Sequence, residues 1–287
     1  MKHRANGRVR ARPGMSRGSI ILLLLIFLTI AIARCTSRDG QDREDQAVTT
    51  QPGSEEKYQS AGDEGLGAAV AIVMDNSGSM KEPAPGDSRP KYQVAREAVA
   101  EMLAATDSFA VGHPDFPIKV GLYQFASGVA RLVDIQAYDR EALRGALMRM
   151  PLPDGGTAIG EALDAARRDL YRAGVIRKYI LVITDGENTS GRSPEEVARE
   201  IARRSEGAVR MHFVAFDVDA AKFAFVRDVR GEVLGAGNAV ALRASLDSIY
   251  RGKILAEAMD AGERLAPSTD SSRSLRTSSD SSRAKKR

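Results

Sequence analysis

Hydrophobic and polar positions follow two different periods in the middle of the chain. Four short runs are rich in apolar residues, and three of them are apolar at almost every position, which is typical of strands covered on both faces: 68–74, 118–125, 179–184 and 209–216. Between these runs, apolar residues recur at helical spacing on three faces: Val94, Ala98, Val99 and Met102; Ile159, Ala162, Leu163, Ala166 and Leu170; Leu242, Leu246, Ile249 and Tyr250. Strands that alternate with helices predict an α/β fold with a doubly wound, mostly parallel sheet.

A hairpin is expected after the second apolar run. Ser127 and Gly128 form a two-residue turn signal between Phe125 and Val129. We therefore expect residues 129–134 to return as an antiparallel strand at the edge of the sheet.

An apolar segment near the N-terminus predicts that the chain is exported. Residues 20–33 are apolar except for Thr29, and they follow a basic leader, residues 1–19, that carries six Lys or Arg and no acidic residue. The segment is short for a membrane span, which needs about 20 residues, but suits the core of a signal peptide, which has about 7–15. The basic leader is expected to stay in the cytoplasm while the following part of the chain is exported.

Three modes of attachment are compatible with this segment. Cleavage after Ala31-Ile32-Ala33 would release a soluble, secreted domain. Cys35 resembles the lipidated cysteine of bacterial lipoproteins, although Arg34 stands where that pattern has a small residue. An uncleaved segment would instead serve as a membrane anchor. The predicted location is extracytoplasmic in all three cases.

Polar segments flank the predicted domain. Residues 34–66 are rich in Gln, Asp, Glu, Ser and Gly and lack apolar periodicity, so we expect a flexible stalk. Residues 263–287 are rich in Ser and Arg, and we expect a disordered tail. The segment 67–262 between them is long enough to bury a single core.

The basic character of the chain lies at its two ends. The formal net charge is +4, yet residues 36–266 carry 36 acidic against 29 basic side chains. This distribution, together with an aromatic content of 5% and no tryptophan, argues against nucleic-acid binding. A single cysteine excludes a disulfide framework within the chain, and three histidines far apart in sequence disfavour a histidine-built metal site. His212, inside an apolar run, is expected to pack in the core.

A polar loop follows the first predicted strand. Asp75 stands at the strand end, and Ser77 and Ser79 follow two residues apart, so that both hydroxyl groups point the same way in a locally extended loop. Gly78 between them permits close approach of the backbone or a positive φ. In a doubly wound sheet, ligands bind beyond the carboxyl ends of the strands, which is where this loop is expected.

Two further loops are expected at the same edge. Gly155 and Gly156 provide a bend without side-chain bulk, and Thr157 after them is a predicted N-cap for a helix that begins near Ala158. Asp185 ends another apolar strand, as Asp75 does.

All five side chains singled out in these loops are oxygen donors, namely Asp75, Ser77, Ser79, Thr157 and Asp185. Oxygen donors suit a hard divalent cation, which makes Mg²⁺ the expected ion, with Mn²⁺ or Ca²⁺ as alternatives. A carboxylate from a partner protein would complete the coordination of the ion. The loops therefore predict protein binding that depends on a divalent cation.

The three loops together resemble the von Willebrand factor type A domain with the metal-ion-dependent adhesion site (MIDAS) of integrin I domains. The resemblance covers about residues 67–262, and all five site positions match. It implies a six-stranded, mostly parallel sheet flanked by helices and no catalysis. It further implies direct ligation by Ser77, Ser79 and often Thr157, with Asp75 and Asp185 acting largely through water, and a partner that offers an Asp or Glu carboxylate to the metal.

Two functions remain open at this point. The chain is either an exported or membrane-anchored module that binds a protein partner through the cation, as in cell adhesion, or a cell-envelope scaffold in which the metal is only stabilising or absent. We expect neither an enzyme nor a small-molecule substrate, because no nucleophile-elbow, HExxH or P-loop motif is present. Glu187 and Asn188 are candidates for the rim that selects the partner.

Overall fold

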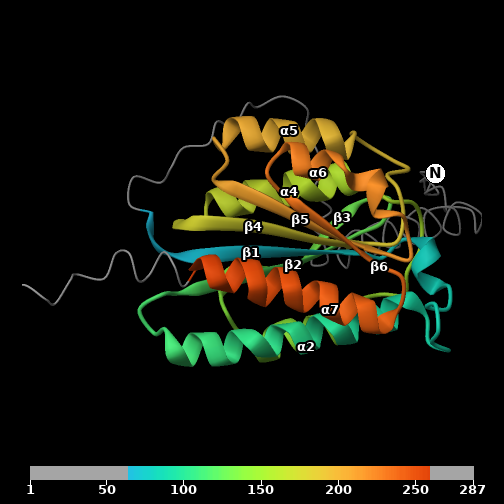
Figure 1. Cartoon of the computed structure of the whole chain (residues 1–287), viewed down its shortest axis with the longest axis horizontal. Coiled ribbons are helices and arrows are strands. Elements are labelled where there is room, and N and C mark those ends of the chain that lie inside the picture. The colour runs from blue at the N-terminus through green and yellow to red at the C-terminus, as the bar shows by residue number, and fades with distance from the viewer. Residues whose placement is uncertain (1–63, 259–287) are drawn as a thin grey trace, which may run out of the picture. The chain divides into compact units, whose positions relative to one another are not determined.

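The computed structural model describes residues 64–258, which are drawn in colour in Figure 1. Several predicted features lie outside these residues: the leader 1–19, the apolar segment 20–33, Cys35, the stalk up to residue 63 and the tail 263–287. Within residues 64–258, no helix is both long enough and apolar enough to cross a membrane.

A six-stranded sheet with the strand order β3-β2-β1-β4-β5-β6 forms the centre of the fold. The strands are β1 (Gly65–Asp75), β2 (Ile118–Phe125), β3 (Val129–Ala137), β4 (Val175–Thr184), β5 (Val209–Phe216) and β6 (Glu232–Ala236). All neighbouring pairs are parallel except β2 and β3, which are antiparallel. The predicted doubly wound, mostly parallel sheet is confirmed, and so is the antiparallel strand after the turn.

Helices cover both faces of the sheet, as Figure 1 shows. One face packs against α2 (Lys91–Gly112), α3 (Arg140–Arg149), α7 (Ala239–Ile249) and the π-helix η3 (Tyr250–Leu255) that continues α7. The other face packs against α4 (Ile159–Tyr171), α5 (Pro194–Arg204) and α6 (Phe225–Asp228). Two short 3₁₀-helices, η1 (Gly78–Lys81) and η2 (Ala220–Phe223), follow β1 and β5.

The core consists of two apolar layers, one on each side of the sheet. Successive residues of a strand point to opposite faces, so Val70 and Ile72 of β1 pack with residues of α2 and α7. Ala71 and Val73 pack with residues of α4 and α5. Because neither face of β1 meets solvent, its sequence is continuously apolar, which is the pattern that revealed it.

Strand β4 begins at Val175, four residues before the predicted start. Lys178 interrupts the apolar pattern there, yet its side chain is fully buried and its Nζ lies 2.7 Å from Glu64 Oε1. Lys178 also donates a hydrogen bond to the carbonyl oxygen of Val175. An ion pair within the sheet therefore extends a strand that hydrophobicity alone predicts too short.

The sixth strand was not located from the hydrophobic pattern. β6 has only five residues, two of which are small, and it pairs in parallel with β5 at the edge of the sheet. Two of its five residues are buried, because an edge strand has one neighbour and is only partly covered by helices. So short and weak a pattern cannot be distinguished from a loop.

Candidate metal centre

The loop after β1 brings two serine hydroxyl groups together. β1 ends at Asp75, and the backbone N–H of Asn76 donates a hydrogen bond to the carbonyl oxygen of Phe125 at the end of β2. Beyond this point the chain turns into η1. The Oγ atoms of Ser77 and Ser79 lie 3.1 Å apart, as expected for two hydroxyl groups on the same side of the loop.

At Gly78 the structure shows a close approach of two loops rather than an unusual φ. Its φ is not positive, and its N–H donates a hydrogen bond of 3.0 Å to the carbonyl oxygen of Gly155. A Cβ atom at position 78 would lie 3.4 Å from the same oxygen, at the short end of ordinary contact. Of the two explanations offered by the sequence, the close approach of two loops is the one that the structure supports.

The glycine pair of the second loop also has a packing reason. Gly155 has a φ of 76°, and a Cβ atom there would lie 2.6 Å from Ser127 Oγ. Gly156 donates its N–H to Ser127 Oγ at 2.8 Å, and a Cβ atom on it would lie 2.9 Å from Thr189 Oγ1. The loop is therefore pressed between the β2–β3 turn and the loop after β4.

The prediction that Thr157 caps the following helix is wrong. α4 begins at Ile159, and the side chain of Thr157 makes no capping hydrogen bond. The N–H of Ile159 instead donates to Asn188 Oδ1 at 2.8 Å, so a distant loop supplies the cap. The hydroxyl of Thr157 lies near Gly186, since a Cβ atom built there would be 3.9 Å from Thr157 Oγ1 and 4.0 Å from Ser79 Oγ. The hydroxyl groups of Thr157 and Ser79 therefore lie within 4 Å of the same point at Gly186.

Asp185 joins the third loop to the first. It follows Thr184, the last residue of β4, and its side chain is fully buried. Asp185 Oδ1 accepts a hydrogen bond of 2.8 Å from Ser79 Oγ. All five predicted site residues thus lie at one edge of the sheet.

Asp75 is held by two hydrogen bonds from its own surroundings. Its Oδ1 accepts from the N–H of Ser77 at 2.8 Å, and its Oδ2 accepts from Thr184 Oγ1 at 2.6 Å. Burial raises the pKa of Asp75 to about 6, although the hydrogen bonds from Ser77 and Thr184 act in the opposite direction. A buried carboxylate of this kind is stabilised by a nearby positive charge.

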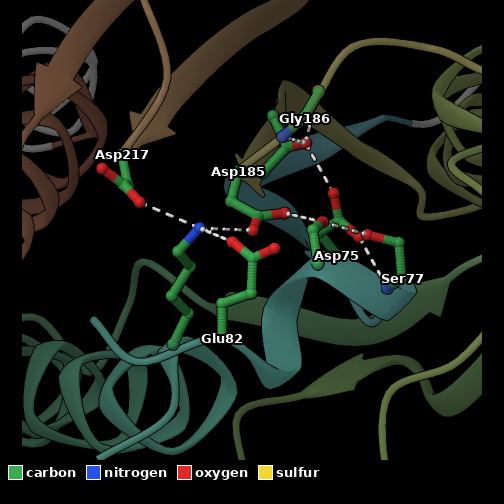
Figure 2. Close-up of polar contacts among 9 residues, drawn as sticks. Asp75, Ser77, Glu82, Asp185, Gly186 and Asp217 are labelled. Atoms are coloured by element: carbon green, nitrogen blue, oxygen red, sulfur yellow. Dashed lines mark hydrogen bonds and ion pairs between the residues drawn. The ribbon is translucent and has the colours of Figure 1, made fainter. Parts of the chain in front are cut away.

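A lysine that the sequence analysis missed lies beside the site. Lys91 Nζ is 3.1 Å from Asp185 Oδ2, 3.1 Å from Glu82 Oε2 and 2.9 Å from Asp217 Oδ2. Figure 2 shows these three carboxylates converging from different loops. Burial by itself lowers the pKa of Lys91, but the hydrogen bonds to Asp217 and Asp185 raise it above its ordinary value. Lys91 therefore carries a positive charge at the rim of the site.

Among the residues that surround Lys91, Asp217 could have been found from the sequence. Asp217 directly follows β5, just as Asp75 ends β1 and Asp185 follows β4. Extending the same strand-end argument to β5 would have found it. Lys91 had no such signal, because a lysine in the first turn of a helix is usually a surface residue.

The two candidates for the partner rim differ in their surroundings. Glu187 is exposed and forms an ion pair of 2.6 Å with Lys222. Asn188 accepts from Ile159 and donates to the carbonyl oxygens of Ser190 and Arg192. The side chain of Asn188 is thus engaged in holding its own loop, whereas partner contact by Glu187 remains a prediction.

The donor set fits a small divalent cation. Ligands at adjacent positions of an Mg²⁺ octahedron, with metal–oxygen distances near 2.0–2.1 Å, lie about 2.9 Å apart. The oxygen pairs Ser77–Ser79 and Ser79–Asp185 are separated by 3.1 and 2.8 Å. Among residues 64–258, no three His, Cys, Asp or Glu side chains cluster closely enough to hold a metal. The hydroxyl groups of Ser77 and Ser79 are oxygen donors of another kind at this edge of the sheet.

The fold and the strand-end loops define the class of protein. Residues 70–187 match the von Willebrand factor type A domain family, a range that includes all five predicted site residues. This part of the chain is thus similar to von Willebrand factor type A domains, as the resemblance in its loops implied.

Three similar proteins illustrate the range of chains that share this fold. The uncharacterized protein YwmC from Bacillus subtilis is 23% identical over 157 residues, which are 52% of this chain and 66% of YwmC. The PilB minor pilin from Streptococcus sanguinis has a TM-score of 0.56 at 15% identity, covering 68% of this chain and 62% of the pilin. Proximal thread matrix protein 1 from the mussel byssus, with zinc in its MIDAS motif, has a TM-score of 0.50 at 18% identity, covering 68% and 47%. The chain spans less than two thirds of the length of each.

Proposed function

We propose that this domain binds a protein partner through a divalent cation held at the three loops. Ser77, Ser79 and Thr157 would bind the ion directly, and Asp75 and Asp185 would act largely through water. The observation that supports the proposal is the 3.1 Å separation of the Ser77 and Ser79 hydroxyl oxygens, which is close to the edge of an Mg²⁺ octahedron. Asp185 Oδ1 lies 2.8 Å from Ser79 Oγ, so its carboxylate is beside the proposed ion position. Mg²⁺ is the proposed ion, with Mn²⁺ or Ca²⁺ as alternatives.

The chemistry of the site is that of recognition rather than turnover. A bound cation supplies a Lewis-acidic position for an Asp or Glu carboxylate of the partner. The chain's hydroxyl groups add ligands without adding charge, so the site keeps an affinity for a further anion. The buried Asp75 and Asp185 balance the charge of the ion and fix the loop geometry.

We further propose that the domain acts outside the cytoplasm. The basic leader and the apolar segment 20–33 support export, with release, lipidation at Cys35 and anchoring as alternatives. A minor pilin, which is a cell-surface type of protein, shares the fold and is consistent with this location.

Replacing both serines tests the proposal. Full-chain protein is unfolded thermally in excess Mg²⁺ or Mn²⁺ and in EDTA, as wild type and as Ser77→Ala/Ser79→Ala. A cation at a hundredfold excess over Kd stabilises the wild type by about 2.7 kcal/mol. For a domain of this size the shift in Tm is roughly 5–10 °C. The double variant should show no shift.

A matched control separates the site from general effects of salt. Ser245→Ala removes a hydroxyl group that lies outside the metal loops and donates a hydrogen bond to the carbonyl oxygen of Gly235. This variant should keep the full cation-dependent shift. If the serine double variant retains the shift, or captures its partner equally well in EDTA, the proposal is wrong.

One observation favours a second candidate, a cell-envelope scaffold in which metal is not needed for binding. The first and third loops are already joined by the hydrogen bond from Ser79 to Asp185, and the first and second by the hydrogen bond from Gly78 to Gly155. For a scaffold, partner capture should be equal in Mg²⁺ and in EDTA. Substitutions at the metal loops should then leave capture unchanged.

A further inference from the structure

Asp185 has only one carboxylate oxygen that faces the hydroxyl groups of the site. Its Oδ1 accepts a hydrogen bond of 2.8 Å from Ser79 Oγ, whereas its Oδ2 lies 3.1 Å from Lys91 Nζ. The side chain of Asp185 is fully buried and that of Lys91 is 5% exposed. Water therefore competes little for this ion pair, and Oδ2 stays engaged.

Lys91 is fixed in this position by three carboxylates. Glu82 lies just after η1, Asp185 follows β4, and Asp217 follows β5, so the ammonium group joins three separate loops (Figure 2). An ammonium group has three N–H donors, which equals the number of carboxylates around it. The backbone N–H of Lys91 also donates to the carbonyl oxygen of Glu82 at 2.9 Å. Turning Lys91 away would leave three carboxylates facing one another.

Asp75 is held in place by its own loop and by the end of β4. Both of its carboxylate oxygens already accept hydrogen bonds, one from the N–H of Ser77 and the other from Thr184 Oγ1. Beside the hydroxyl groups of Ser77, Ser79 and Thr157, the carboxylate of Asp185 thus offers a cation, directly or through water, only the one oxygen that Lys91 does not engage.

So small a set of donors discriminates between cations. Mg²⁺ takes six ligands at 2.0–2.1 Å and usually keeps several waters, so a few protein oxygens are sufficient. Ca²⁺ takes six to eight oxygen ligands and commonly uses both oxygens of a carboxylate. By engaging Asp185 Oδ2, Lys91 withholds the oxygen that would let Asp185 bind a cation with both of its carboxylate oxygens.

We infer that Lys91 determines the cation selectivity of this site, favouring Mg²⁺ over Ca²⁺ by restricting Asp185 to a single free oxygen. The inference rests on the proposed function, because it concerns the same ion. Without the ammonium group, Asp185 Oδ2 becomes free and the carboxylates of Glu82 and Asp217 remain beside it. Ca²⁺ gains donors that Mg²⁺ does not need.

Calorimetric titration of the full chain with Mg²⁺ and with Ca²⁺ tests this inference in the wild type and in Lys91→Met. Methionine keeps the length of the side chain and removes its charge. In Lys91→Met we expect the ratio of the Kd for Ca²⁺ to the Kd for Mg²⁺ to fall by about tenfold, which corresponds to 1.4 kcal/mol in favour of Ca²⁺. A change of less than threefold, or a change toward Mg²⁺, overturns the inference.

Two further variants control for charge and folding. Lys222→Met removes a lysine whose ion pair is with Glu187 rather than Asp185, and its selectivity should equal that of the wild type. Lys91→Met/Asp217→Asn removes one positive and one negative charge together, so it frees Asp185 without adding net charge. This double variant should show the same shift toward Ca²⁺ even if the single variant fails to fold.

The outcomes separate this inference from the proposed function. Wild type that binds Mg²⁺, with an unchanged ratio in the Lys91 variants, supports the proposed function and overturns the inference. Wild type that binds neither cation contradicts the proposed function. In that case, Ca²⁺ binding gained by the Lys91 variants still supports the inference, and its absence overturns both.

Discussion

His212 illustrates how burial determines the chemistry of a single residue. It lies within β5 with 4% of its surface exposed, as expected for a core residue. Its ring stacks on Tyr179 with a centroid separation of 6.2 Å. Neither ring nitrogen has a hydrogen-bond partner among residues 64–258. Burial lowers the pKa of His212 to about 4, so the ring is neutral at pH 7.

Replacing His212 should reduce the acid sensitivity of the fold. The folded pKa of about 4 is below the unfolded value of 6.5, so the unfolded chain binds more protons between these values. The contribution to stability is complete above pH 6.5 and is lost as the pH falls toward 4, by roughly 2 kcal/mol between pH 7 and pH 5. Between pH 7 and pH 5, the free energy of unfolding of His212→Leu should fall by roughly 2 kcal/mol less than that of the wild type. Urea unfolding at the two pH values measures the difference, and equal losses would show that His212 is not responsible.

The residues of the site differ in whether the local sequence marks them as site residues. Asp75 and Asp185 could be predicted because each stands at the end of a buried strand, and Ser77, Ser79 and Thr157 because they lie in the adjoining loops. Their meeting at one edge follows from local sequence and a parallel sheet. The position of Lys91 depends on Glu82 and Asp217, which local sequence does not bring to it.

At the scale of elements, the start of α4 shows how a helix end can depend on another segment. Thr157 has the residue type of an N-cap but lies one residue before the N-cap position, Ala158, and Asn188 provides the hydrogen bond to Ile159. The loop after β4 lies against this helix start, since the N–H of Thr189 donates to the carbonyl oxygen of Thr157. Asn188 therefore stabilises both the helix and its own loop.

Asn188→Ala should lower stability more than Thr157→Val. The asparagine variant loses the cap and two donated hydrogen bonds, so we expect a cost of about 1–3 kcal/mol. Thr157→Val keeps the shape of the side chain and loses no cap, so its cost in EDTA should be smaller. Denaturant unfolding in EDTA gives both values. The reverse order would indicate that Thr157 supports the helix after all.

Strands show the same division between local and distant causes. β1, β2 and β5 could be predicted because runs rich in apolar residues mark strands buried on both faces. The early part of β4 could not, because its buried Lys178 requires Glu64 as a partner. β6 could not, because its assignment depends on pairing with β5 rather than on its own sequence.

At the scale of the whole molecule, the order of the strands creates the site. β1 lies between β2 and β4, so the loop after β1 lies between the β2–β3 turn and the loop after β4. Hydrogen bonds from Gly78 to Gly155 and from Gly156 to Ser127 join these loops into one surface. Cation binding should therefore affect three distant parts of the sequence together.

Amide hydrogen exchange of the full chain tests this expectation. The central strands β1 and β4 should exchange most slowly, and the edge strands β3 and β6 faster, because edges are only partly covered. Excess Mg²⁺ should slow exchange in the three loops 75–79, 154–157 and 185–187 at once. In helix α5, which contains none of the site residues, exchange should slow only as much as the increase in global stability predicts. Slowing in one loop alone would contradict a shared cation.

The amino-acid sequence by itself determined the class of fold and the five oxygen donors. Apolar runs, helical periodicity and polar residues at strand ends are local properties, and their consequences follow from the alternation of strands and helices. Only the tertiary structure decided which side chains neutralise and cap those groups. Lys91 reaches Asp185 and Asp217, and Asn188 reaches Ile159, across loops far apart in sequence. Such contacts depend on how the strands are ordered and packed, which single segments do not encode.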